Sequence, residues 1–177
     1  MIREELVADA EALGRRVEEL AAALFRDYAH SGLTVLCIAP GARRFVADLT
    51  RALAARGVAA DRLDLRVQRL DETELGPVQV DPFDVDRLRD REVVVVDDIA
   101  DEGLLLPSVV ELIETACEVR SIRTAVLVDK RERRRVSVSP DYVGFAVERG
   151  RIFGYGIDAG AGEDSLDRIG VWIDERF

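Results

Sequence analysis

One short stretch, residues 92–106, constrains the fold more than any other part of the chain. It contains four consecutive valines, Val93 to Val96, followed at once by the acids Asp97 and Asp98. An unbroken run of β-branched residues predicts a strand that is buried on both faces of a parallel sheet. Two adjacent carboxylates resist burial, so they need a cation, a ligand or water. Because ligands bind beyond the carboxyl ends of parallel strands, this stretch predicts a binding crevice at the two acids.

The residues that follow this strand indicate which kind of ligand the crevice holds. A third acid, Asp101, is followed by Glu102 and Gly103. Carboxylates bind Mg²⁺ and accept hydrogen bonds from ribose hydroxyls, and the amide groups of a loop at a helix start bind phosphate. The pattern therefore favours a sugar phosphate chelated by a metal ion. A strand that ends in a solvated acidic turn, with no ligand, is the alternative.

The rest of the chain alternates helix-like and strand-like segments. Hydrophobic periodicity predicts helices over residues 3–29, 43–56 and about 107–118, and strands over 34–39, 62–70, 93–96, 123–128, 141–145, 152–157 and 169–173. Residues 71–82 contain Gly, two Pro and several acids, and are predicted to be a loop or a flexible hairpin. Strands that alternate with helices predict an α/β fold with a doubly wound sheet. The length of 177 residues fits one domain, residues 1–177.

Composition argues against several classes of protein. The net charge is −10, whereas nucleic-acid binding needs clustered Lys and Arg, so we do not expect a nucleic-acid partner. One basic run exists, residues 130–135 (KRERRR), and it begins with the only lysine, Lys130. Two isolated cysteines and one histidine give neither a zinc site nor a disulfide framework. With no apolar run of about 20 residues and a charged N-terminus, we expect a cytoplasmic protein with no membrane partner.

Several ordered motifs resemble those of known enzymes. Residues 92–106 resemble the phosphoribosyl pyrophosphate (PRPP) motif of type I phosphoribosyltransferases. Lys130 at the end of an apolar strand, residues 141–144 (DYVG) and residues 153–158 (FGYGID) resemble hypoxanthine-guanine phosphoribosyltransferases in order and spacing. The resemblance implies a mainly parallel sheet flanked by helices, with a small hood built from the chain ends. It also implies transfer of ribosyl 5-phosphate from PRPP to hypoxanthine or guanine, a purine salvage reaction that releases pyrophosphate and uses Mg²⁺.

The resemblance implies a role for each residue that contacts the base. Lys130 would bind the O6 and N7 atoms of a 6-oxopurine through its ammonium group. Tyr142 would stack on the base, and Val143 would present backbone groups to its edge. Asp101 would lie near N7 and act as the general base. A solvated lysine and a core tyrosine are the structural alternatives for Lys130 and Tyr142.

The resemblance also implies the residues that contact the sugar, the metal and the phosphates. Asp97 and Asp98 would bind the ribose hydroxyls and Mg²⁺, and Asp158 would reach a second Mg²⁺ through water. Gly41 lies in the turn that corresponds to the pyrophosphate loop, and Glu102-Gly103 lies in the 5′-phosphate loop.

Four departures from the family pattern fall on the phosphate-binding side. Pro40, which lacks an N–H group, begins the pyrophosphate loop, and Leu104 to Leu106 replace the hydroxyl-bearing residues of the 5′-phosphate loop. Acids occupy the segment that corresponds to the mobile lid (residues 71–74), and Asp164 stands where an Arg is usual. Each lost charge-assisted hydrogen bond costs about 1.5–3 kcal/mol, so together these departures predict weaker binding of PRPP.

The departures leave two other functions open. One is a catalytically weak or inactive relative that binds a purine nucleotide, and a less favoured one is an RNA-binding regulator on the same fold. Among the arginines, Arg43, Arg44 and Arg69 are candidates to replace the lost phosphate contacts. The small-molecule partners we expect are PRPP and a purine base or nucleotide, in a homodimer or a homotetramer.

Overall fold

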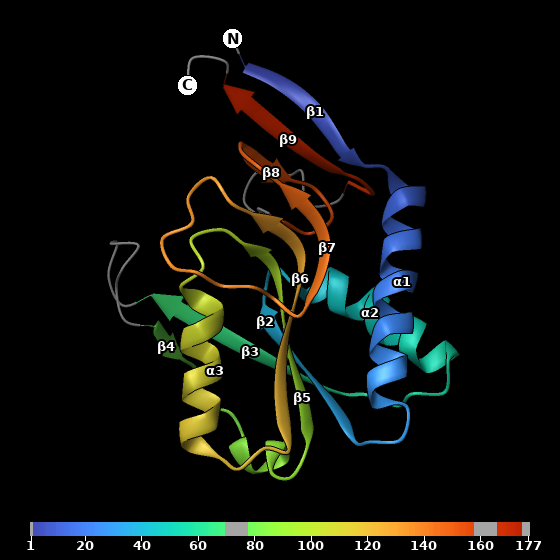
Figure 1. Cartoon of the computed structure of the whole chain (residues 1–177), viewed down its shortest axis with the longest axis vertical. Coiled ribbons are helices and arrows are strands. Elements are labelled where there is room, and N and C mark those ends of the chain that lie inside the picture. Colours follow the sequence, from blue (N-terminus) through green and yellow to red (C-terminus); the bar gives the residue numbers. More distant parts are fainter. Residues whose placement is uncertain (1, 70–77, 158–165, 175–177) are drawn as a thin grey trace.

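The computed structural model describes residues 2–69, 78–157 and 166–174, and its strands form two sheets (Figure 1). The larger sheet has six strands in the order β4-β3-β2-β5-β6-β7. These strands are β2 (Leu33–Ala39), β3 (Asp61–Arg69), β4 (Val78–Val80), β5 (Glu92–Ala100), β6 (Ser121–Lys130) and β7 (Tyr142–Val147). Every neighbouring pair is parallel except β3 and β4. The predicted doubly wound, mainly parallel sheet is confirmed.

The valine run lies in β5, at the centre of this sheet. Val94 and Val96 pack into the core that contains residues of α1 (Ala10–Tyr28) and α2 (Arg43–Ala55). Val93 and Val95 pack on the opposite face, with residues of α3 (Leu105–Ala116) and the short 3-10 helix η1 (Val85–Leu88). Figure 1 shows α3 and α1 on opposite sides of the sheet. A strand between two helical layers has to be apolar on both faces, which the unbroken run provides.

The smaller sheet is a hood built from the two ends of the chain. It consists of β1 (Ile2–Ala8), β8 (Arg151–Phe153) and β9 (Ile169–Asp174), in the antiparallel order β1-β9-β8. Figure 1 shows it beyond the end of the large sheet at which β6 and β7 finish. The hood that the resemblance implied is therefore present, and it closes over the carboxyl ends of the central strands.

The helix predicted over residues 3–29 is wrong in its first part. The carboxylate of Asp9 accepts a hydrogen bond from the backbone N–H of Ala12 (2.8 Å), so α1 begins only after this cap. The residues before it pair with β9 instead, from Ile2 opposite Asp174 to Ala8 opposite Ile169. Pairing with the far end of the chain overrides the local helical pattern, which sequence periodicity alone does not reveal.

Other element boundaries differ from the prediction by a few residues. The predicted strand over 152–157 is shorter, because Gly154, Tyr155 and Gly156 adopt positive φ angles after β8 ends at Phe153. Residues 78–80 form the short strand β4 inside the predicted loop or hairpin, and residues 70–77 lie outside the described part of the chain. Within the described residues, no helix is long and apolar enough to cross a membrane.

Candidate active site

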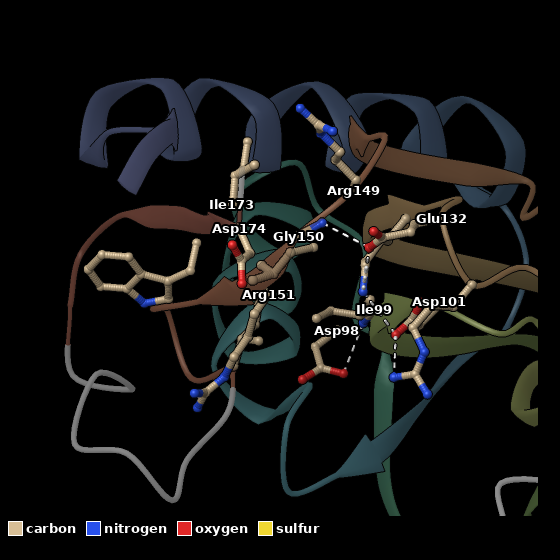
Figure 2. Close-up of a pocket in the computed structure, with 14 residues that line it drawn as sticks. Asp98, Ile99, Asp101, Glu132, Arg149, Gly150, Arg151, Ile173 and Asp174 are labelled. Carbon is tan, nitrogen blue, oxygen red and sulfur yellow. Dashed lines mark hydrogen bonds and ion pairs between the residues drawn. The ribbon is translucent and has the colours of Figure 1, made fainter. Parts of the chain in front are cut away.

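A cleft of about 570 Å³ lies between the carboxyl ends of β5 and β6 and the hood (Figure 2). The large sheet and the segments after β5 and β6 contribute Asp98, Ile99, Asp101, Lys130, Glu132 and Arg133. The hood and its flanking turns contribute Arg149–Ile152, Ile157 and Trp172–Asp174. Figure 2 shows Gly150 and Arg151 of the hood on one side and Asp98 and Asp101 on the other. The N–H of Gly150 donates to the Glu132 carboxylate (3.0 Å), which ties the hood to the end of β6. The crevice predicted beyond the valine strand is thus a cleft roofed by the hood.

Asp97 and Asp98 lie near the end of β5, where Asp97 is buried outside the lining of the cleft and Asp98 is half-buried and lines it. The backbone N–H of Asp98 donates to the Asp97 carboxylate, and the N–H of Ile99 donates to that of Asp98, both at 2.9 Å. Burial raises the pKa of the Asp97 carboxyl well above its usual range, and the neighbouring charge of Asp98 raises it further. Burial also raises the pKa of Asp98. A cation or hydroxyl donors beside the pair would favour its ionised form.

Gly41, in the predicted pyrophosphate loop, lies very close to the Asp98 carboxylate. A Cβ at this position would lie 2.2 Å from Oδ2 of Asp98 and 2.8 Å from its Cγ, so only glycine lets the β2–α2 turn come this near. Pro40 precedes it without an N–H group. The β2–α2 turn therefore brings its backbone close to Asp98 at one side of the cleft.

Asp101 and Lys130 form a charged pair that faces the cleft. Lys130 is the last residue of β6, its side chain is only 8% exposed, and its Nζ lies 3.2 Å from Oδ2 of Asp101. Oδ1 of Asp101 is buried and accepts no hydrogen bond from any described residue. A buried carboxylate oxygen without a donor is energetically costly, so this atom is unusual among the polar atoms of a folded protein.

The basic run packs directly on the loop that follows β5. Arg134 donates to the backbone carbonyls of Ala100 and Asp101, each at 3.0 Å, and forms an ion pair with Asp129. Gly103 has a φ of +83°, and a Cβ there would lie 2.8 Å from the Arg134 side chain. The run is therefore part of the wall of the cleft, which the net charge had not suggested.

Glu102 is buried beneath two other arginines of the same run. Its carboxylate lies 3.1 Å from Nη2 of Arg133 and 3.9 Å from Nε of Arg135, and the residue is 6% exposed. The backbone N–H of Arg135 donates to the Glu102 carbonyl (2.9 Å). These contacts hold the acid of the predicted 5′-phosphate loop by ion pairs to the chain itself.

The structure does not bring Tyr142 and Val143 to the cleft, which corrects their assignment to the base. β7 runs parallel to β6, and Tyr142 pairs with Ala125, five residues or about 16 Å before Lys130. The Tyr142 hydroxyl donates to Asp27 and accepts from Arg123 (3.0 Å). Tyr142 therefore lies at the opposite end of the strand, where it joins β7 to the end of α1.

The remaining predicted residues fall outside the described part of the chain. These are Asp158, the expected second metal contact, Asp164, and the acidic lid segment 71–74. Conversely, the cleft contains hood residues that sequence reasoning missed, above all Arg151 and Trp172. Trp172 is the only tryptophan, which was a usable signal, and its ring stacks on that of Phe153 at 5.0 Å. Nothing in the sequence distinguishes Arg151 from the other arginines.

The two adjacent acids at the end of β5 fit a magnesium ion that arrives with its ligand. Within the described residues there is no group of three His, Cys, Asp or Glu side chains that could hold a metal alone. Mg²⁺, however, is usually bound through one or two carboxylates together with substrate phosphates. Asp97 and Asp98 supply two adjacent carboxylates, and a divalent cation beside them would offset the burial that raises their pKa values. The donor set therefore fits Mg²⁺ bound jointly with a diphosphate.

Comparison with known proteins places the chain in a family. The model of the phosphoribosyl transferase domain matches residues 5–159. The hypoxanthine-guanine phosphoribosyltransferase of Bacillus subtilis (strain 168) is 28% identical, over 95% of this chain and 92% of that protein. Its counterpart from Aquifex aeolicus (strain VF5) is 32% identical, over 88% and 87%. A solved structure of the Trypanosoma cruzi hypoxanthine phosphoribosyl transferase superposes with a TM-score of 0.87 at 29% identity, over 96% of this chain and 91% of that one. The chain belongs to the hypoxanthine-guanine phosphoribosyltransferase family of type I phosphoribosyltransferases.

Proposed function

We propose that this protein is a magnesium-dependent purine phosphoribosyltransferase, which transfers ribosyl 5-phosphate from PRPP to hypoxanthine or guanine. The bond between ribose C1′ and the pyrophosphate oxygen breaks, a bond between C1′ and N9 of the base forms, and the base loses one proton. Positive charge develops on the ribose in the transition state. The site therefore has to neutralise the departing pyrophosphate and exclude water from the sugar.

The observation that carries this proposal is the pairing of Asp101 with Lys130 in the cleft. In a 6-oxopurine, the acceptor O6 lies beside N7, which carries a proton in one tautomer. Lys130 would donate to O6, while Oδ1 of Asp101, which has no donor among the described residues, would accept the N7 proton as N9 attacks C1′. An ammonium group has no acceptor, so a 6-aminopurine would present a donor to a donor. The pair therefore selects 6-oxopurines and supplies the general base.

The flat faces of the base would be covered by Ile99 on the sheet side and by Arg151 of the hood. Both residues line the cleft, from opposite sides. A planar guanidinium stacks on an aromatic ring about as an aromatic side chain does. Arg151 would thus do the work that the sequence had suggested for Tyr142.

The sugar side of the reaction would lie over the acids at the end of β5. Asp97 and Asp98 would accept hydrogen bonds from the ribose hydroxyls and hold Mg²⁺ together with the diphosphate of PRPP. The cation supplies charge stabilisation for the leaving pyrophosphate. Gly41 would let the β2–α2 turn approach this group closely. Asp158 remains a proposed second metal contact.

The partners of the protein are predicted from its family. PRPP and a 6-oxopurine would be its substrates, and the homodimer or homotetramer and the cytoplasmic location stay predictions from the sequence. Sedimentation analysis of the purified protein would establish the oligomeric state.

Calorimetric titration with single ligands tests the proposal. Mg²⁺-PRPP and GMP should each bind, and GMP should bind more tightly than AMP, because Lys130 discriminates O6 from an amino group. EDTA should weaken the binding of PRPP. Failure to bind both PRPP and GMP, or equal binding of GMP and AMP, would overturn the proposed function.

A further inference from the structure

The basic run after β6 lies against a phosphate loop that lacks its usual hydroxyl groups. Leu104 and Leu105 follow Gly103 at the start of α3, and the N-cap residue, Leu104, makes no capping hydrogen bond through its side chain. Backbone N–H groups are then the only donors that residues 103–105 themselves offer to an anion. Tight binding of a phosphate here would need a cationic side chain from another part of the chain.

Two of the three arginines that the sequence suggested as replacements, Arg43 and Arg44, lie outside the cleft. Arg43 forms an ion pair with Asp64 (2.9 Å), and Arg44 pairs with Asp167 and lies over the Tyr155 ring, 4.6 Å from its centre. Neither lines the cleft. The side chain of Arg69 lies outside what the structure describes. Within the part of the chain that the structure describes, the cation therefore has to come from another segment.

Among residues 131–135, Arg133 is the arginine whose position suits contact with a bound phosphate. It lines the cleft, its side chain is 47% exposed, and its two terminal nitrogens lie 3.1 Å from the Glu102 carboxylate and 3.7 Å from that of Asp101. It thus spans the first two residues of the phosphate loop. Arg134 is instead committed to backbone carbonyls and to Asp129, with a side chain only 16% exposed.

We propose that Arg133 is a substrate-binding residue, which holds the 5′-phosphate of PRPP or of a purine nucleotide against the loop of residues 101–105. A guanidinium carries five N–H donors in a planar fork, so it can keep a carboxylate and still donate to phosphate oxygens. Arg133 and Arg135 also offset the charge of Glu102, which would otherwise repel the phosphate. This inference rests on the proposed function, because it assigns a ligand group within the same cleft.

Comparing a nucleotide with its nucleoside isolates the phosphate contact. GMP and guanosine share the base and the ribose and differ only in the 5′-phosphate. Arg133→Ala should weaken GMP binding by about 10- to 100-fold, the scale of one charge-assisted contact, and leave guanosine binding unchanged. Arg133→Gln, which keeps the length of the side chain, should give the same pattern, and Arg133→Lys should lose less.

Arg131→Ala is the matched control. Arg131 belongs to the same run, its side chain is 60% exposed, it pairs with Asp129 at 3.3 Å, and it does not line the cleft. Its removal should change the affinity for neither ligand. Thermal unfolding of each variant checks that the fold is intact, and Arg133→Lys serves as the test variant if the neutral substitutions unfold.

The outcomes separate this inference from the proposed function. If the unmodified protein prefers GMP over guanosine and the Arg133 variants keep that preference, Arg133 is not the phosphate ligand, although the proposed function stands. Equal losses of GMP and guanosine affinity would also overturn the inference, because the residue would then act on the base or on the fold. If the unmodified protein binds neither ligand, the proposed function and the inference fail together.

Discussion

Replacing Gly41 with alanine tests how closely the pyrophosphate turn must approach the acids of β5. The added Cβ would lie 2.2 Å from Oδ2 of Asp98, whereas unstrained contacts need about 3.5 Å. The Asp98 carboxylate or the turn must therefore move by about 1 Å. Such a movement would break or lengthen the hydrogen bond from the Ile99 N–H to Asp98 (2.9 Å). We expect Gly41→Ala to destabilise the fold by about 1–3 kcal/mol, the range for a buried acceptor that loses its partner.

Gly14→Ala is the matched control, since the same methyl group is added in open space. Gly14 lies inside α1, and a Cβ there would meet no atom within 4 Å. Alanine in a helix interior is favoured over glycine by about 0.5–1 kcal/mol, so this variant should be more stable than the unmodified protein.

Denaturant unfolding of the two variants should therefore give changes of opposite sign. Calorimetry should detect weaker binding of Mg²⁺-PRPP only in Gly41→Ala, because Asp98 is displaced only there. If Gly41→Ala is as stable as Gly14→Ala and binds Mg²⁺-PRPP normally, the close approach of the turn to Asp98 has no role in stability or binding.

The remaining predictions concern the base and the buried acids. Lys130→Ala should weaken GMP binding by about 1.5–3 kcal/mol, measured by calorimetry, whereas Tyr142→Leu, which removes the aromatic ring, should leave it unchanged; the reverse pattern would assign the contact with the base to Tyr142. Asp101→Asn should lower the turnover number by about 10²- to 10⁴-fold with little change in GMP affinity, and equal losses in both would make Asp101 a binding residue only. Burial raises the pKa of Asp97, so the folded protein binds the proton of this carboxyl more tightly than the unfolded chain does. The stability of the folded protein therefore falls as the pH rises from about 3.9, the pKa in the unfolded chain, through the raised pKa of the folded state. In thermal unfolding without Mg²⁺, Asp97→Asn should therefore be stabilising at pH 7 and lose that advantage near pH 4, and an advantage that grows on acidification would refute the burial argument.

The parts of the fold that local patterns specify could be predicted from the sequence. The run Val93 to Val96 has one compatible environment, the centre of a parallel sheet, and the acids after it follow from the polarity of that sheet. The strand β1 could not be predicted in the same way. Residues 2–8 carry a helical pattern, and only their pairing with β9 makes them a strand.

In the candidate site, too, the residues placed by local patterns could be predicted, and those placed by contacts between distant segments could not. Asp98, Asp101 and Lys130 stand at the carboxyl ends of β5 and β6, so the end of each strand was enough to bring them together. Tyr142 was misplaced because its position depends on the register of β7 against β6, which a motif in the sequence does not specify. Arg151 enters the cleft through the pairing of the hood strands, again a contact between distant segments.

Turnover with three purine bases tests whether the protein is a phosphoribosyltransferase for 6-oxopurines. The protein would be incubated with Mg²⁺-PRPP and hypoxanthine, guanine or adenine, and the nucleotide and pyrophosphate would be quantified. With hypoxanthine or guanine, we expect one pyrophosphate for each nucleotide formed. EDTA should stop the reaction, and adenine should give no product. No nucleotide from either 6-oxopurine, or turnover of adenine at a similar rate, would overturn the proposed function.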